Sequence, residues 1–199
     1  MYSEIVPEPR FIYDVGTYYM EATGFILNSS TLNLKYILGL LNSKLLFWYF
    51  KDIGYNLGGK GYRYKKIFIE QLPLKITNNV KENNIIILVD DLLKLNEKIT
   101  NQNNSFIKLI IKECNVKNIS KNLEEFYKLT PKEFFREIKK QKGVISNEDK
   151  LKLEFEENSL IINKNIEKID LIENNLNKII YDIYELNQGE IEIIENHFK

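Results

Sequence analysis

The residues best suited to chemistry in this 199-residue chain lie between positions 51 and 66, in the stretch KDIGYNLGGKGYRYKK. Five lysines and arginines stand there against one acidic side chain, Asp52, and three tyrosines and four glycines are interleaved with them. Lysine attracts phosphate whatever the base sequence, and arginine binds the edge of guanine through two hydrogen bonds. Tyrosine binds phosphate or stacks on a displaced base. This composition predicts a surface that contacts DNA.

The candidate DNA-binding residues are the five cations and three tyrosines of this stretch: Lys51, Tyr55, Lys60, Tyr62, Arg63, Tyr64, Lys65 and Lys66. Its glycines would let the backbone approach a duplex closely and adopt positive φ. The residues alone leave a second interpretation open. In that interpretation the stretch is a solvated basic loop, and its tyrosines pack on the preceding helix.

Other reactive side chains lack the partners that catalysis needs. Glu137-Ile138-Lys139 has the Glu-x-Lys form of metal-dependent nucleases, but we expect it on a helix, where both charged side chains would be solvated. His197 has no serine or cysteine placed by any sequence rule to act with it, and we expect it at the surface. Cys114 lies among apolar residues and is predicted to be a buried thiol. We therefore expect no catalytic residue and no metal site in this chain.

Motifs for cofactors are also missing. The chain has no Pro-Pro pair for the tetrapeptide that holds a target amine in base methylation, no P-loop, and a single Gly-x-Gly at Gly59 to Gly61, which follows a helix rather than a strand. One cysteine and one histidine exclude a disulfide scaffold and a Cys/His zinc site. No apolar run approaches the roughly 18 residues of a membrane span, and the N-terminus lacks signal-peptide features. We expect a cytoplasmic protein with no cofactor of its own and no membrane partner.

Net charge is zero, which on its face argues against a nucleic-acid partner. The sum hides a strong asymmetry, since residues 1–76 carry +3, residues 77–147 carry +4 and residues 148–199 carry −7. Neutrality is the cancellation of a basic region by an acidic C-terminal segment. It does not exclude DNA binding.

The elements that must position the basic stretch differ from the rest of the chain. Residues 1–76 hold 15 of the 24 aromatic residues and 7 of the 9 glycines. Residues 11–27 predict two or three short antiparallel strands, and apolar spacing predicts one amphipathic helix from about Leu32 to just before Gly54. A loop then leads into a predicted strand, Lys66 to Leu72, which Pro73 ends.

From residue 80 onward the pattern is helical. Apolar seams at 85–99 and 162–183 have coiled-coil spacing and favour antiparallel pairing, either as a coiled coil or as ordinary packed amphipathic helices. Thr130-Pro131 and Asn187 predict capped starts of two short helices, the second at the C-terminus. We predict an α+β protein. Residues 1–76 form a small unit of mixed antiparallel sheet and helix, to which the resemblance described next assigns DNA target recognition, and residues 77–199 form a helical, partly coiled-coil-like region.

Several strings in the first 76 residues resemble the TaqI-like C-terminal specificity domain: EPRF from Glu8, LKYILGLLNSKL from Leu34, Phe50-Lys51, GGKGYRYKK from Gly58 and QLP from Gln71. The end of the chain is similar to the ends of the enzymes that contain this domain, through Ile169-Asp170 and the stretch from Ile179 to Leu186. The likeness covers most of residues 8–76 and 166–195. Asn187-Gln188-Gly189 departs from the usual Gly-Leu-Thr, and the methyltransferase domain that normally precedes this region is missing.

The resemblance implies the DNA sequence-recognition domain of a type IIG restriction-modification enzyme or an adenine-N6 DNA methyltransferase. Its partners would be double-stranded DNA and the methyltransferase or nuclease domains of the parent protein. Catalytic residues, the S-adenosylmethionine site and any Mg²⁺ site of a nuclease would lie in those other domains, so this chain would not be an enzyme by itself. The alternative function is a helical protein-interaction module that docks on a methyltransferase or nuclease partner.

Overall fold

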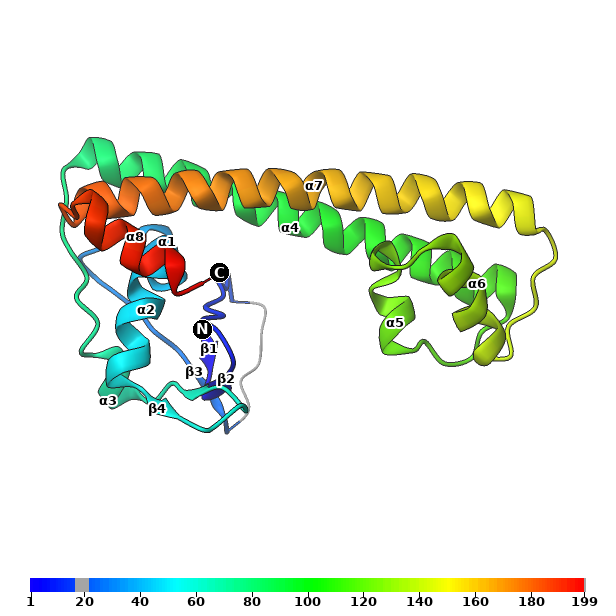
Figure 1. Cartoon of the computed structure of the whole chain (residues 1–199), viewed down its shortest axis with the longest axis horizontal. Helices are drawn as coiled ribbons and strands as arrows, with labels where there is room; N and C mark the ends of the chain where they lie inside the picture. The colour runs from blue at the N-terminus through cyan, green and yellow to red at the C-terminus, as the bar shows by residue number, and fades with distance from the viewer. Residues whose placement is uncertain (17–21, 199) are drawn as a thin grey trace. The chain divides into compact units, whose positions relative to one another are not determined.

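The structure is a computed structural model that describes residues 1–16 and 22–198 (Figure 1). It contains two compact units. Unit 1 combines Met1–Asp91 with Ile172–Lys199, and unit 2 is Leu92–Leu171. Short strands and many helices together confirm the α+β class. The units do not follow the sequence division at residue 76, because the last residues of the chain return to pack on the first ones.

The strands of unit 1 are very short and form two antiparallel sheets. β1 (Tyr2–Ser3) pairs with β3 (Gly24–Phe25), with Tyr2 opposite Phe25. The second sheet has the order β2-β5-β4, from β2 (Ile5–Val6), β5 (Tyr62–Arg63) and β4 (Tyr55–Asn56). Of the strands predicted within 11–27, β3 is the one found in the described residues, while 17–21 lie outside them.

The prediction of a single helix from about Leu32 to just before Gly54 was wrong. The structure has two helices, α1 (Leu34–Leu41) and α2 (Lys44–Ile53). Ser43 begins α2 as its N-cap, and its hydroxyl accepts a hydrogen bond from the Leu46 amide. The Asn42 amide exchanges two 3.0 Å hydrogen bonds with the backbone of Phe11. These polar partners stabilise a break that the apolar spacing alone does not reveal.

The strand predicted from Lys66 to Leu72 was also wrong. Lys66–Ile69 is a short helix, α3, with Lys65 at its N-cap. Ile69 and Leu72 are buried while Ile67 is exposed. Burial at positions three apart suits a helical turn, whereas a strand would place Ile67 and Ile69 on one face.

Helices from later in the chain complete unit 1. α1 packs closely on the first turns of α4 (Asn79–Cys114) and the last turns of α7 (Glu148–Ile183), since a Cβ atom on Gly39 would lie 2.9 Å from Ile85 and 3.7 Å from Leu176. The predicted cap at Asn187 is confirmed, because it forms a capping box at the start of α8 (Gln188–Asn196). Glycine at position 39 is thus required by close helix packing.

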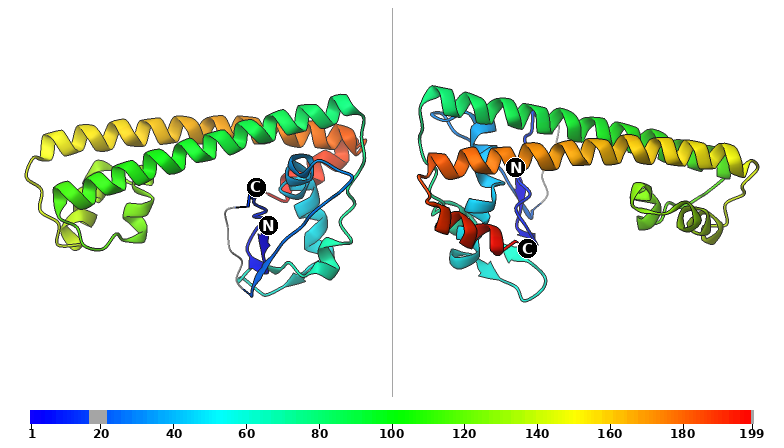
Figure 2. Two further views of the ribbon diagram at one scale, coloured as in Figure 1. Left: turned by 180° about the vertical axis from the view of Figure 1, so that it is seen from behind. Right: turned by 45° about the horizontal axis from the view of Figure 1, so that its top comes forward.

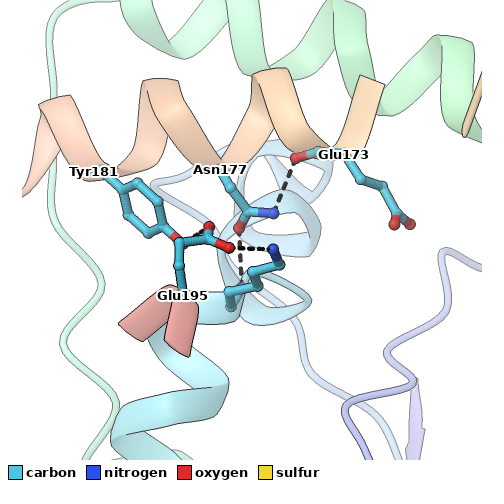
Figure 3. A network of polar contacts seen from close by, with 5 residues as sticks. Glu173, Asn177, Tyr181 and Glu195 are labelled. Atoms are coloured by element: carbon cyan, nitrogen blue, oxygen red, sulfur yellow. Dashed lines mark hydrogen bonds and ion pairs between the residues drawn. The ribbon is translucent and has the colours of Figure 1, made fainter. Parts of the chain in front are cut away.

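A polar network joins α2, α7 and α8 within unit 1 (Figure 3). The Asn177 side chain accepts a 3.0 Å hydrogen bond from the Lys44 amide and donates one to the Glu173 carbonyl. The Glu195 carboxylate binds both the Lys44 ammonium, at 2.6 Å, and the Tyr181 hydroxyl, at 2.8 Å. Residues 173–195 therefore anchor the start of α2 rather than forming a separate tail.

Unit 2 is all helical and consists of α4 from Leu92 onward, α5 (Lys121–Glu124), the 3₁₀ helix η1 (Phe126–Lys128), α6 (Pro131–Lys140) and α7 up to Leu171. Four phenylalanines on different elements meet in its core: Phe106, Phe126, Phe134 and Phe155. Cys114 is buried beside this cluster, as predicted, and burial raises the pKa of its thiol.

The predicted antiparallel pairing of the two seams is confirmed within each unit (Figure 2). In unit 1, Lys81 of α4 lies 2.6 Å from Asp182 of α7. In unit 2, Gln102 donates to Asn158 at 2.6 Å, and Glu113 pairs with Lys150 at 2.9 Å. In unit 2 the partner numbers fall along α7 as they rise along α4, which is the signature of antiparallel helices.

The predicted capping box at Thr130 is confirmed at the start of α6, with Pro131 in its first turn. The expectation that Glu137 is a solvated residue was wrong. Its side chain is almost fully buried, 2.5 Å from the Lys140 ammonium and 3.3 Å from the Ser120 hydroxyl, and the lysine lowers the pKa of this carboxyl. A buried carboxylate needs such a partner, so Glu137 has a structural role.

Across the described residues, no helix is both long and apolar enough to cross a membrane.

Candidate nucleic-acid interface

The predicted basic stretch forms a β-hairpin followed directly by α3. β4 and β5 are its strands, with Tyr55 opposite Arg63 and Asn56 opposite Tyr62. The Leu57 amide donates to the Gly61 carbonyl at 2.9 Å, and the Asn56 side chain accepts from the Gly58 amide at 2.8 Å. Gly58, Gly59 and Gly61 all have positive φ. The glycine-rich tip is therefore a defined turn, whose backbone only glycine adopts at little cost.

One face of the three-stranded sheet carries a row of residues available to a partner. Ile5, Arg63 and Tyr55 lie side by side across β2, β5 and β4. Ile5 is 47% exposed, Tyr55 is 58% exposed, and the Arg63 side chain is 36% exposed. Residues directly opposite on neighbouring strands share a face, so the arginine lies between an aliphatic and an aromatic side chain on one accessible surface.

The alternate residues point the other way, into unit 1. The Tyr62 ring packs edge-on against Phe47 and Phe50 of α2, and the Tyr64 ring stacks on Phe50 with centroids 4.1 Å apart. Tyr64 is only 2% exposed, and burial raises the pKa of its hydroxyl far above the ordinary value. Tyr64 is thus placed as a core residue that holds the hairpin on α2, and Tyr62 lies half-buried at the same boundary.

The cations of the stretch differ in how freely they could meet phosphate. Lys60 at the tip and Lys65 at the start of α3 are exposed, and neither forms an ion pair within residues 1–16 and 22–198. The Arg63 guanidinium lies 3.3 Å from the Glu4 carboxylate, and the Lys66 ammonium lies 3.4 Å from the carboxylate of Glu70, the C-cap residue of α3. Lys60 and Lys65 are therefore the most available positive charges.

Lys51 is placed apart from the others, on α2. Its ammonium lies 4.5 Å from the ring centroids of both Phe47 and Phe198. Such contacts are attractive because the ring faces carry partial negative charge, and burial against them lowers the pKa of the lysine. The structure brings seven of the eight predicted residues into the hairpin and the start of α3, and it gives Lys51 a packing partner of its own.

Two residues that sequence reasoning missed belong to this surface, Ile5 and Glu4. Ile5 begins β2 and Glu4 directly precedes it, some sixty positions before Arg63, and the pairing of β2 with β5 brings both to the arginine. The alternation Tyr62, Arg63, Tyr64 was an available signal, because period-two alternation predicts that the arginine faces away from both tyrosines. The second interpretation, tyrosines packed on the preceding helix, describes Tyr62 and Tyr64 but not the exposed Tyr55.

Comparison with protein families gives two adjacent matches. A family model described as the TaqI-like C-terminal specificity domain matches residues 1–74. A second, described as a domain of unknown function (DUF8810), matches residues 78–180, slightly more than half of the chain. The chain belongs to the DUF8810 family and begins with a TaqI-like C-terminal specificity domain. No curated protein and no solved structure gives a significant match.

The TaqI-like C-terminal specificity domain is a DNA-specificity domain of restriction and methyltransferase enzymes, and it is not catalytic by itself. Its match contains the whole hairpin and α3 but ends before α4. The compact unit built around it also includes parts of α4 and α7 and all of α8. The likeness of residues 166–195 to the ends of these enzymes lies outside the specificity-domain match and stays a prediction.

Proposed function

We propose that this chain is the DNA sequence-recognition part of a type IIG restriction-modification enzyme or an adenine-specific DNA methyltransferase. It would position duplex DNA for a catalytic domain that lies outside these 199 residues. The observation that carries the proposal is the exposed row of Ile5, Arg63 and Tyr55 within a TaqI-like specificity domain, on the same hairpin and α3 start that carry the exposed Lys60 and Lys65. S-adenosylmethionine, and Mg²⁺ for a nuclease, would bind to those other domains. Duplex DNA as the partner agrees with the cytoplasmic location expected from the sequence.

The hairpin suits a groove of DNA for steric and electrostatic reasons. The major groove of B-DNA is about 12 Å wide and admits a two-stranded β-ribbon. At its edge, Lys60 and Lys65 would contact phosphates, while Arg63, oriented by Glu4, would reach a base edge. Phosphate contacts supply affinity without sequence preference, so specificity in this arrangement depends on Arg63 and its neighbours.

Replacing Lys60 and Lys65 together by alanine tests the phosphate contacts. We expect the affinity for duplex DNA to fall about tenfold or more at 100 mM salt, and the slope of log K against log salt to become shallower by about two units. The measurement is a salt titration by fluorescence anisotropy. Lys168→Ala with Lys178→Ala is the matched control, since both lysines are exposed on α7 and the change in charge is the same. Equal losses in the two double variants would contradict the proposal.

Arg63→Ala tests base recognition separately. A base contact predicts a loss of discrimination between the cognate and unrelated duplexes of about 1–3 kcal/mol, with little further loss on unrelated DNA. The parent enzyme supplies the cognate sequence through its methylation or cleavage sites. Unchanged discrimination in the variant would remove Arg63 from the reading surface.

A specific observation also supports the alternative, a module that docks on a protein partner. Leu153, Leu160 and Leu171 of α7 are all more than half exposed. Leu160 and Leu171 follow Leu153 by 7 and 18 residues, which places all three on one face of the helix, since each residue turns about 100°. Size-exclusion chromatography with and without a DNA duplex separates the two functions: self-association with no shift on adding DNA favours docking, and a DNA-dependent shift favours recognition.

A further inference from the structure

A second basic surface belongs to α6 in unit 2, a helix whose place is seen in Figure 1. Lys132, Arg136 and Lys139 follow one another at i, i+4 and i+7, which places them along one side of the helix. All three are exposed, and within the part of the chain that the structure describes none of them forms an ion pair. These aligned cations are therefore available to a ligand outside the chain.

The acidic side chains nearest to this row are mostly engaged elsewhere. The Glu133 carboxylate caps its own helix by accepting hydrogen bonds from the Thr130 amide and hydroxyl, at 2.8 Å each. These bonds lower the pKa of Glu133, and the positive charge of Arg136 lowers it further. Glu137 is turned inward to Lys140. Glu148 lies on the rim of the shallow hollow that the row borders, and Lys152 lies on the same rim. The surface therefore keeps an excess of positive charge.

The row is held in fixed geometry by the core beneath it. Phe134 and Ile138 on the opposite side of α6 are completely buried, and the capping box fixes the first turn. From Lys132 to Lys139 the helix rises about 10 Å, at 1.5 Å per residue. Cations spread over this length can contact neighbouring phosphates along one strand of DNA.

The side chains of this surface suit the sugar-phosphate backbone of a nucleic acid better than its bases or a free nucleotide. Phe135, the aromatic residue that lines the hollow, is 8% exposed and offers no ring face for stacking. The hollow is open and shallow, which suits an extended polyanion better than an enclosed small molecule.

We propose that the α6 surface binds the sugar-phosphate backbone of duplex DNA without reading its sequence, through Lys132, Arg136 and Lys139. This inference rests on the proposed function, which gives duplex DNA as the ligand. It assigns the backbone contact to the DUF8810 part of the chain. The hairpin would then supply discrimination, while α6 adds affinity that is the same for every sequence.

The test replaces Lys132, Arg136 and Lys139 together by alanine in the full chain. Alanine is the best helix former, so α6 should persist, which circular dichroism and thermal unfolding check. We expect at least a tenfold loss of affinity for duplex DNA at 100 mM salt, equal for cognate and unrelated sequences, and a salt slope shallower by about three units. The matched control is the triple variant Lys108→Ala, Lys164→Ala and Lys168→Ala, which removes the same charge from exposed positions of unit 2 outside the hollow.

The outcomes separate this inference from the proposed function. Wild-type affinity in the α6 variant, together with weakened binding in the Lys60 and Lys65 variant, would overturn the inference and leave the proposed function standing. Loss in the α6 variant alone would support the inference and contradict a hairpin reading surface. Equal losses in the α6 and control triples would overturn the inference, as would tighter binding of duplex RNA or of polyglutamate than of DNA. A wild-type chain that binds no DNA would overturn both.

Discussion

Phe50→Ala should lower the free energy of unfolding of unit 1 by about 3–5 kcal/mol and abolish DNA binding by the hairpin. Phe50 is 1% exposed and lies between α2 and the hairpin, stacked on Tyr64 at 4.1 Å and edge-on to Tyr62 at 6.3 Å. Removing the ring leaves a cavity beneath β5 and takes away the surface on which both tyrosines pack. The hairpin strands are two residues long and would not keep their place without it.

Urea unfolding followed by tyrosine fluorescence measures this change, with DNA binding measured in parallel. Tyr64→Phe is the matched control at the same contact, because it keeps the ring and removes only a hydroxyl that has no hydrogen-bond partner among the described residues. We expect its stability to stay within about 1 kcal/mol of the wild type. A Phe50→Ala variant as stable as that control would show that the hairpin is not held by the aromatic stack.

Gly61→Ala should be the most damaging single-methyl change in the hairpin, lowering the free energy of unfolding by about 2–4 kcal/mol. Gly61 has a φ of +102°, and a Cβ atom there would lie 2.5 Å from the Val6 carbonyl oxygen and 2.8 Å from Pro7. The neighbour is backbone of the paired strand β2 and cannot move without disturbing the sheet. The variant should also lose the row of Ile5, Arg63 and Tyr55, since β2 carries Ile5.

Gly59→Ala is the control for this substitution. Gly59 also has positive φ, +72°, but a Cβ atom would meet nothing within 4 Å. Only the conformational cost of about 1–2 kcal/mol should appear, with DNA binding largely kept. Thermal unfolding and anisotropy titrations on both variants compare the two costs directly. Equal destabilisation by the two alanines would mean that the close approach of residue 61 to Val6 does not limit the side chain at this position in solution.

Local sequence was sufficient where a structure depends on near neighbours. The capping boxes at Thr130 and Asn187 and the buried Cys114 all follow from residues within a few positions of one another. The apolar seams predicted the antiparallel packing of α4 and α7, because helical periodicity places the buried positions on one side.

Sequence failed where a distant partner changed a local preference. The helix predicted across Asn42 and Ser43 is broken because Asn42 bonds to Phe11, thirty-one positions earlier. Glu137 was expected in solvent, yet folding places it against Ser120 and Lys140 in the interior. Lys140 is one helical turn away, but Phe11 and Ser120 lie thirty-one and seventeen positions from their partners, so no short-range pattern contains them.

By itself the sequence determined the kind of protein: an α+β chain whose glycine-rich, tyrosine-rich basic stretch marks a TaqI-like specificity domain. Only the tertiary structure decided which side chains of that stretch are available. Pairing of β5 with β2 turns Arg63 outward beside Ile5 and Tyr55, while the Phe50 ring draws Tyr62 and Tyr64 inward. The physical reason is that the two faces of a strand differ only in what packs against them, and here that partner comes from another part of the chain.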